Sequence, residues 1–184
     1  MSFSDIHNFF DDVEVDQEWI SLGRTITEAD IINFAGVSGD YNPIHIDHEF
    51  AKTTPFRKPI AHGVLVWSIS SGLSVYAPPM RTLAFLRVEN WEFKRAVFVG
   101  DTIRVNTKIL EIDERSRGRR AEITWHRQII NQDEQVVQGG ITVTLVEGRA
   151  NLQRSKAKAR AKLDAAQIEA SVGEGNNGPP VAGA

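Results

Sequence analysis

An acid and an imidazole five residues apart, Asp40 and His45, are the feature of this sequence best suited to chemistry. They lie in the run FAGVSGDYNPIH, which begins at Phe34. Gly39 and Pro43 interrupt the backbone here, because a proline two residues before a histidine prevents a smooth helix. The two polar side chains therefore flank a kinked loop, where both can reach one water molecule. Many active sites are built from polar groups on a loop that structured elements hold.

A carboxylate and an imidazole can hold a water molecule between them and exchange protons with it. Each residue also has a simpler interpretation: Asp40 alone is typical of a turn, and His45 alone of a buried structural histidine. Together with His48 they could bind a metal ion, but their spacing fits no strong metal signature, and we expect no metal. His62 is ambiguous, and we expect it mainly to pack or brace the start of a helix.

Composition excludes several classes of protein. The 184 residues suffice for one domain with its own core. The absence of cysteine excludes disulfides, thiol catalysis and thiolate metal sites. The net charge of −3 gives no reason to expect nucleic acid as a partner. No apolar stretch approaches the roughly 20 residues that cross a membrane, and no secretory signal begins the chain, so we expect a soluble, cytoplasmic protein.

Two helices are expected to position the polar pair. The first follows Thr27, whose hydroxyl can cap it with Asp30 as the partner in a capping box, and it ends at Ser38 and Gly39. The second covers residues 64–75, a run that is apolar or small on every side. A strand is the alternative there, but the length and the small residues favour a helix that is buried all round.

Alternating apolar and polar residues predict strands over residues 18–25, 81–93, 102–112, 118–130 and 136–146. The fold class is therefore α+β, with one curved antiparallel sheet wrapped around one long buried helix. We divide the chain into an N-terminal arm (1–16), the main domain (17–148), a helical extension (149–170) and a disordered tail (171–184).

The motif around Asp40 and His45 closely resembles that of the MaoC-like dehydratases, which include the (R)-specific enoyl-CoA hydratases. Further matches are Phe50-Ala51, Ala61-His62-Gly63 and the run VFVGD at 97–101, and the resemblance covers roughly residues 15–147. It implies a hot-dog fold and a homodimer whose sheets join edge to edge. It also implies reversible addition of water to a trans-2-enoyl-CoA to give a (R)-3-hydroxyacyl-CoA, with no cofactor apart from the coenzyme A of the substrate.

The resemblance implies a role for each motif residue. Asp40 and His45 hold the water, with Asp40 as the principal base. The backbone N–H of Gly63, at a helix start, stabilises the thioester oxygen as it gains charge. Asn42 fixes the loop or orients a catalytic partner, and Ser71 lies near the carboxylate and can tune its basicity.

Substrate contacts are less specific in the sequence. Trp67, on the long helix, can narrow an acyl tunnel. Arg57 and Lys58 can meet the phosphates of coenzyme A, as can Arg87, Lys94 and Arg95, although solvated surface charge is the simpler interpretation of each cation. We therefore expect an acyl-CoA thioester as substrate, in a homodimer or higher oligomer without nucleic acid or membrane partners.

Other functions remain open from the sequence. In a hot-dog thioesterase a carboxylate would direct water at the thioester carbonyl carbon instead of C3. A non-catalytic acyl-binding protein, a subunit of a hetero-oligomeric dehydratase, or an enzyme acting on acyl-carrier-protein thioesters are further alternatives. The sequence does not indicate the length or branching of the acyl chain.

Overall fold

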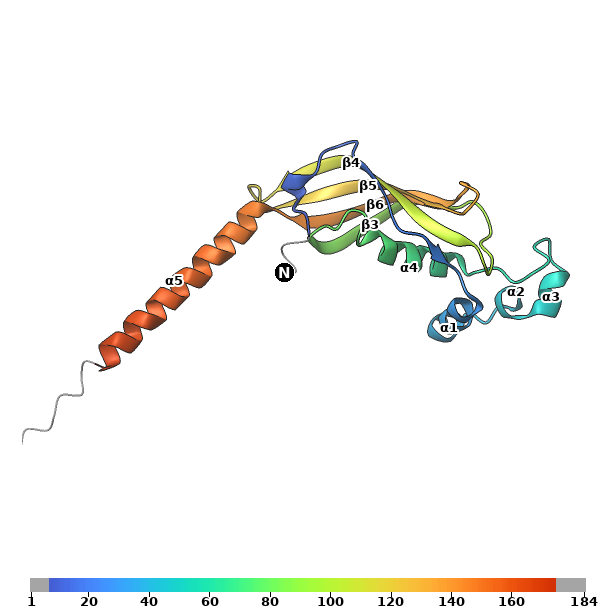
Figure 1. The fold of residues 1–184 in the computed structure, drawn as a ribbon, viewed down its shortest axis with the longest axis horizontal. Helices are drawn as coiled ribbons and strands as arrows, with labels where there is room; N and C mark the ends of the chain where they lie inside the picture. Colours follow the sequence, from blue (N-terminus) through green and yellow to red (C-terminus); the bar gives the residue numbers. More distant parts are fainter. Residues whose placement is uncertain (1–6, 175–184) are drawn as a thin grey trace, which may run out of the picture.

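A computed structural model of the chain describes residues 7–174. A curved antiparallel sheet arches over helix α4 (Gly63–Ser74), which lies along its inner side (Figure 1). Three small helices, α1 (Glu28–Ser38), α2 (Pro43–Ile46) and α3 (His48–Lys52), gather at one end of this body. Helix α5 (Arg149–Glu174) projects from the opposite end (Figure 1). The predicted α+β class is confirmed.

The sheet has the strand order β1-β4-β5-β6-β3, with β2 also paired to β4. The long strands confirm the alternation seen in the sequence, but the expected first strand is two short ones, and its apolar member Leu22 is 86% exposed. Strand β3 lies at one edge and pairs only with β6 among the described strands. The strand bounds are β1 (Glu18–Ile20), β2 (Arg24–Thr25), β3 (Thr82–Phe93), β4 (Thr102–Arg115), β5 (Arg120–Ile130) and β6 (Val136–Glu147).

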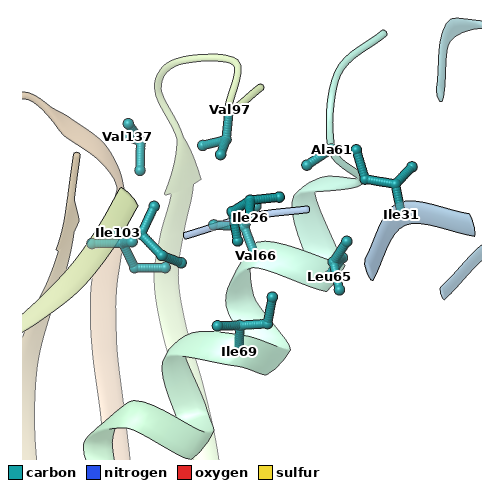
Figure 2. Close-up of a cluster of buried hydrophobic side chains, with 10 residues drawn as sticks. Ile26, Ile31, Ala61, Leu65, Val66, Ile69, Val97, Ile103 and Val137 are labelled. Atoms are coloured by element: carbon teal, nitrogen blue, oxygen red, sulfur yellow. The ribbon is translucent and has the colours of Figure 1, made fainter. Parts of the chain in front are cut away.

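Burial of every second side chain attaches the sheet to α4. Along β4, Ile103, Val105 and Ile109 are buried and their neighbours in sequence are less so, which is the period of two that a half-buried strand requires. Ile103 packs with the buried face of α4, and Figure 2 shows the cluster that results. Its members are Ile26, Ile31, Ala61, Leu65, Val66, Ile69, Val97, Ile103, Ile129 and Val137.

Helix α4 is not buried all round, which corrects the prediction for residues 64–75. One stripe of it, Val64, Ser68, Ser71 and Val75, is exposed. These positions recur at the three- and four-residue spacing of a single helix face. The sheet therefore covers only part of the helix surface within one chain.

Both ends of the chain differ from the expected arm and tail. Phe9, Phe10 and Val13 are buried, and the last two pack in a second core cluster with Trp125, so the arm contributes apolar side chains to the core. Helix α5 begins where the sequence predicts and continues four residues past the expected end of the extension. Residues 1–6 and the rest of the expected disordered tail lie outside the described residues.

Within residues 7–174, no helix combines the length and the apolar character that crossing a membrane requires.

The core cluster should dominate stability. Ile129 is fully buried in it, and Ile129→Ala should lower the free energy of unfolding by about 2–5 kcal/mol because the cavity left behind cannot close completely. Ile20→Ala, at an exposed position of β1, should change it by less than about 0.5 kcal/mol. Urea denaturation of both variants measures the difference, and equal losses would show that the cluster is not the main core.

Candidate active site

The backbone around Asp40 is fixed by a helix end and a helix start. Helix α1 begins with the predicted capping box of Thr27 and Asp30, and ends at Gly39, whose φ of 76° is a left-handed conformation that glycine adopts without strain. Three residues later the side chain of Asn42 accepts a hydrogen bond from the N–H of Ile44 and caps α2. Asp40 therefore sits on a short connection with both ends anchored.

His45 lies in the four-residue helix α2 and not in an open loop as the sequence suggested. Pro43 causes the difference: as the first residue of α2 it has no N–H that the helix would need, so it starts this helix instead of preventing one. The break in the chain is upstream of the proline, between α1 and α2. The prediction that Asp40 and His45 are not on one continuous helix still holds.

The imidazole of His45 is held by its Nδ1, which lies 2.8 Å from the carbonyl oxygen of Ile60. A carbonyl only accepts, so Nδ1 carries the proton and donates. In the neutral ring, Nε2 is then an acceptor, and it lies 3.9 Å from Oδ2 of Asp40. That distance is too long for a direct hydrogen bond. It is short enough for one water molecule to contact both atoms.

His62 completes this cluster, although the sequence indicated mainly a bracing role. Its Nε2 lies 2.9 Å from the backbone carbonyl oxygen of Asp40, to which it donates. Its ring stacks on that of His45 with 3.7 Å between centroids, and the side chain is 1% exposed. Its Nδ1 is buried without a hydrogen-bond partner among the described residues. His62 therefore braces Asp40 and His45 directly. In the sequence, its position next to Gly63 was the one weak indication of this role.

Gly63 is the first residue of α4, and the preceding residue provides no side-chain cap. The N–H groups of a first helical turn lack partners inside the helix. The carbonyl of Gly63 accepts a hydrogen bond from Gln138 of β6 at 2.9 Å, which fixes the helix start against the sheet. A Cβ at this position would lie 2.7 Å from the ring of Phe93, so only glycine leaves this space open.

A cavity of about 300 Å³ adjoins the cluster. His45 and Gly63 both line it, and Arg95 contributes a cation to its wall. Most of its other residues are apolar: Phe56, Ile60, Ala61, Val66, Phe93, Ala96 and Val97. The Asp40 side chain is half exposed and approaches His45 without being part of this wall. The cavity can take an apolar chain whose reactive end meets the polar pair.

The structure does not bring every expected residue to the pair. Ser71 lies two turns along α4 on its exposed face and makes no hydrogen bond to Asp40 within the described chain. Trp67 packs edge-on against Phe85 and Trp91, away from the cavity wall. Within a single chain, therefore, neither residue contacts the cluster.

The expected phosphate-binding cations are near but not in the cavity wall. Arg57 donates to the carbonyl of Lys52 and is exposed. Lys58 lies 4.3 Å over the ring of Phe98. Arg95, which the sequence singled out less strongly, is the cation that lines the cavity itself. It is therefore better placed than Arg57 or Lys58 to meet an anionic group at the opening.

Asp40, His45 and His62 also resemble a metal-binding group, since their ligand atoms lie within 4.8 Å of one another. However, His45 uses Nδ1 and His62 uses Nε2 to donate to carbonyl oxygens. A protonated ring nitrogen cannot bind a metal. This leaves Nε2 of His45 and the carboxylate as ligands on the open side, fewer than a zinc site uses.

Comparison with known proteins gives the family. The family model of the MaoC-like domain matches residues 13–129, which is more than half of the chain and includes the whole cluster. The chain belongs to the MaoC-like domain family. The resemblance of the motif around Asp40 and His45 is confirmed by this match.

Relatives in this family are characterised as hydratases or dehydratases. The chain is 37% identical over 93 residues to the (R)-specific enoyl-CoA hydratase of Aeromonas caviae, covering 50% of this chain and 69% of the relative. It is 34% identical over 114 residues to the 3-hydroxybutyryl-CoA dehydratase of Methylorubrum extorquens, covering 61% of this chain and 71% of the relative.

Similar solved structures confirm the hot-dog fold. The (R)-hydratase of A. caviae involved in PHA biosynthesis superposes with a TM-score of 0.62 at 32% identity, covering 72% of this chain and 96% of that one. A monoamine oxidase regulatory protein of Archaeoglobus fulgidus superposes with a TM-score of 0.70 at 31% identity, covering 77% of this chain and 95% of that one. A Mycobacterium tuberculosis protein described as a double hot-dog fold superposes with a TM-score of 0.68 at 21% identity, covering 77% of this chain and 44% of that one.

Two glycines near the site should respond differently to alanine. At Gly63 the new Cβ meets only the ring of Phe93, which is 57% exposed and can move, so Gly63→Ala should cost less than about 1 kcal/mol of stability. At Gly140 it meets backbone atoms of Asn90 and Trp91 within 2.8 Å, and Gly140→Ala should cost about 1–3 kcal/mol. Chemical denaturation compares them, and a larger loss at Gly63 would contradict this packing.

Proposed function

We propose that this protein is an enoyl-CoA hydratase, which adds water reversibly to a trans-2-enoyl-CoA and forms a (R)-3-hydroxyacyl-CoA. The observation that carries the proposal is the 3.9 Å separation of Asp40 Oδ2 and His45 Nε2 beside a cavity that Gly63 also lines. The hydratases and dehydratases among the relatives support the same reaction.

The polar pair would act on one water molecule. Asp40, as principal base, takes a proton from the water while the water oxygen bonds to C3 of the substrate, and the polar pair then returns that same proton to C2. Nε2 of His45 is the acceptor on the other side of the water, because the Ile60 carbonyl fixes the proton on Nδ1. The hydrogen bond from His62 holds the backbone of Asp40, and the Asp40 carboxylate accepts from the N–H of Asn42 at 3.2 Å. Both partners are therefore oriented before the substrate binds.

The thioester oxygen gains negative charge as the water attacks C3. The N–H of Gly63 is suited to stabilise it, since it is a first-turn donor without a partner inside the helix and lies at the positive end of the α4 dipole. One such donor contributes about 3 kcal/mol to transition-state stabilisation in comparable enzymes. The reaction as proposed requires no cofactor and no metal, since the chain's own groups supply every proton transfer.

The homodimer belongs to the same proposal. The open edge of β3 carries large exposed apolar residues, and the exposed stripe of α4 lies on the helix beneath it. Pairing two β3 strands antiparallel about a two-fold axis would cover both features and remove an exposed edge. The apolar residues on β3 are Leu83, Phe85, Leu86, Val88 and Phe93.

Removing either polar group should abolish hydration. Asp40→Asn and His45→Gln should each lower kcat/KM for crotonyl-CoA by about 10²–10⁴-fold, because one proton acceptor on the water is lost. Loss of the enoyl absorbance measures the reaction, and thiol release measured in parallel reports thioesterase activity. His48→Gln is the matched control, since His48 is exposed and bonds to Glu28 outside the site. Full activity in either site variant would remove that residue from the mechanism.

A charge on the β3 edge should separate the dimer. Val88→Arg places an unpaired cation where two strands would meet, and light scattering should show a shift from dimer to monomer. Leu110→Arg is the control, because Leu110 of β4 is similarly exposed, at 43% against 40%, but lies on a strand paired on both sides. A wild-type monomer, or equal behaviour of both variants, would contradict dimerisation through β3.

A further inference from the structure

Arg127 is a half-buried cation that has no anionic partner among the described residues. It lies on the inner face of β5, between Trp125 and Ile129, which are almost completely buried. Its Nε is shielded from solvent and has no hydrogen-bond partner, and no carboxylate of the described residues forms an ion pair with it. Its guanidinium lies over the ring of Trp125, with 5.6 Å between Cζ and the ring centroid. An unpaired charge in such a place is costly unless something compensates it.

The strands beside Arg127 carry further unsatisfied groups. Thr107 of β4 is directly opposite it, and Thr142 of β6 is its diagonal neighbour. Both threonines are almost fully buried, and neither hydroxyl has a hydrogen-bond partner among the described residues. Buried polar groups are nearly always satisfied. Arg127, Thr107 and Thr142 lie on neighbouring strands and together form a polar patch between the two apolar clusters of the core.

A second cavity, of about 220 Å³, opens at Arg127. Ser74, from the last turn of α4, and Thr144, whose hydroxyl accepts from Trp125, provide hydroxyl groups in its wall. Arg81 also lines it, but Arg81 is paired with Glu147 at 2.7 Å. Of the two arginines in this wall, Arg127 is therefore the one without a carboxylate partner among the described residues, and His7 is the remaining titratable group in the wall. The cavity shares no wall residue with the one beside His45.

The charge of Arg127 persists in this environment. Burial lowers the pKa of Arg127 to about 10, which leaves the guanidinium protonated at neutral pH. A guanidinium donates two parallel hydrogen bonds to a planar carboxylate. Each carboxylate group is planar and carries one charge, so it matches a single guanidinium better than a tetrahedral, doubly charged phosphate group does.

We propose that the cavity at Arg127 is a binding site for a carboxylate group on a small organic ligand. Arg127 provides the charge, and the hydroxyl of Thr144, which accepts from Trp125, keeps a proton to donate. The hydroxyl of Ser74, in contrast, already donates to the carbonyl of Ser70. The carboxylate can belong to a free organic acid or to the far end of an acyl group bound for reaction.

The proposed dimer favours the second source. Two β3 strands that pair antiparallel about a two-fold axis place the Thr82 end of one strand beside the Phe93 end of the other. Thr82 lines the cavity at Arg127, and Phe93 lines the cavity at His45. The carboxylate site of one subunit would thus adjoin the reaction cavity of its partner. The substrate class would be enoyl-CoA thioesters that end in a second carboxylate, an assignment that rests on the proposed function.

Equilibrium binding tests the site independently of any activity. Calorimetry with glutarate, its neutral diamide glutaramide and inorganic phosphate should show saturable binding of glutarate alone. Arg127→Met should weaken glutarate binding at least tenfold. Arg127→Lys keeps the charge but loses the two parallel hydrogen bonds of the guanidinium, so it should weaken binding less. Arg154→Met, which removes a charge from exposed α5, should bind as the wild type does. Equal binding of the diamide, tighter binding of phosphate, or no glutarate binding to wild type would overturn the proposal.

Kinetics distinguish the two sources. Wild-type kcat/KM for an enoyl-CoA with a terminal carboxylate should exceed that for the methyl-ended thioester of equal length, and Arg127→Met should reduce this ratio at least tenfold. Glutarate binding without such a preference assigns the site to a free carboxylate. If the protein hydrates crotonyl-CoA but neither binds glutarate nor prefers a terminal carboxylate, the carboxylate site at Arg127 is contradicted and the proposed function is not. Glutarate binding without activity on any enoyl-CoA contradicts the proposed function alone.

Discussion

Two hydrogen bonds from imidazoles to backbone carbonyls determine the geometry on which the site depends. His62 donates to the carbonyl of Asp40, and His45 donates to that of Ile60. Each bond fixes one ring and the proton on it, and the stacking of the rings at 3.7 Å ties the two together. As a result a carboxylate and an unprotonated nitrogen face each other across 3.9 Å. The carboxylate itself is held by a third hydrogen bond, which its Oδ1 accepts from the N–H of Asn42 at 3.2 Å.

The rest of the fold holds these carbonyls and the helix start in place. The extended segment before α4 is fixed by the N–H of Ala61, which donates to the carbonyl of Val97 at 2.7 Å. Gln138 then joins the first turn of α4 to β6. Because β6 lies within the sheet and α4 is packed on its inner side, the Gly63 N–H has a defined position relative to His45. The rigidity of the site is thus that of the sheet and helix together.

Much of the fold follows from local signals in the sequence. Thr27 and Asp30 form the capping box that their spacing predicts, and Gly39 ends α1. The strands follow the alternation of apolar residues, as Ile103, Val105 and Ile109 illustrate. The failures are instructive: Pro43 starts a helix at its first position, and α4 keeps an exposed stripe because residue type alone does not say which neighbours cover a helix. Phe9 and Phe10 reach the core through tertiary contacts that no local pattern records.

The candidate site was predictable in part for the same reason. Asp40, Asn42 and His45 are close in sequence, so their motif indicates them together. His62 and Arg127 join polar clusters only through stacking and strand register, across more than 15 residues of chain. Their signal in the sequence is weak: a histidine next to a helix-start glycine, and an arginine at an inward position of a strand. Only the structure indicates that each has a buried ring or guanidinium nitrogen without a hydrogen-bond partner among the described residues.

The central claim is that Asp40 and His45 act on one shared water molecule, and a double-mutant cycle on kcat/KM for crotonyl-CoA tests it most directly. If both groups hold the same water, the variant that combines Asp40→Asn with His45→Gln should lose about as much as the worse single variant, because residues that act as a unit are not additive. If the two losses multiply, the groups act independently and the shared water is contradicted.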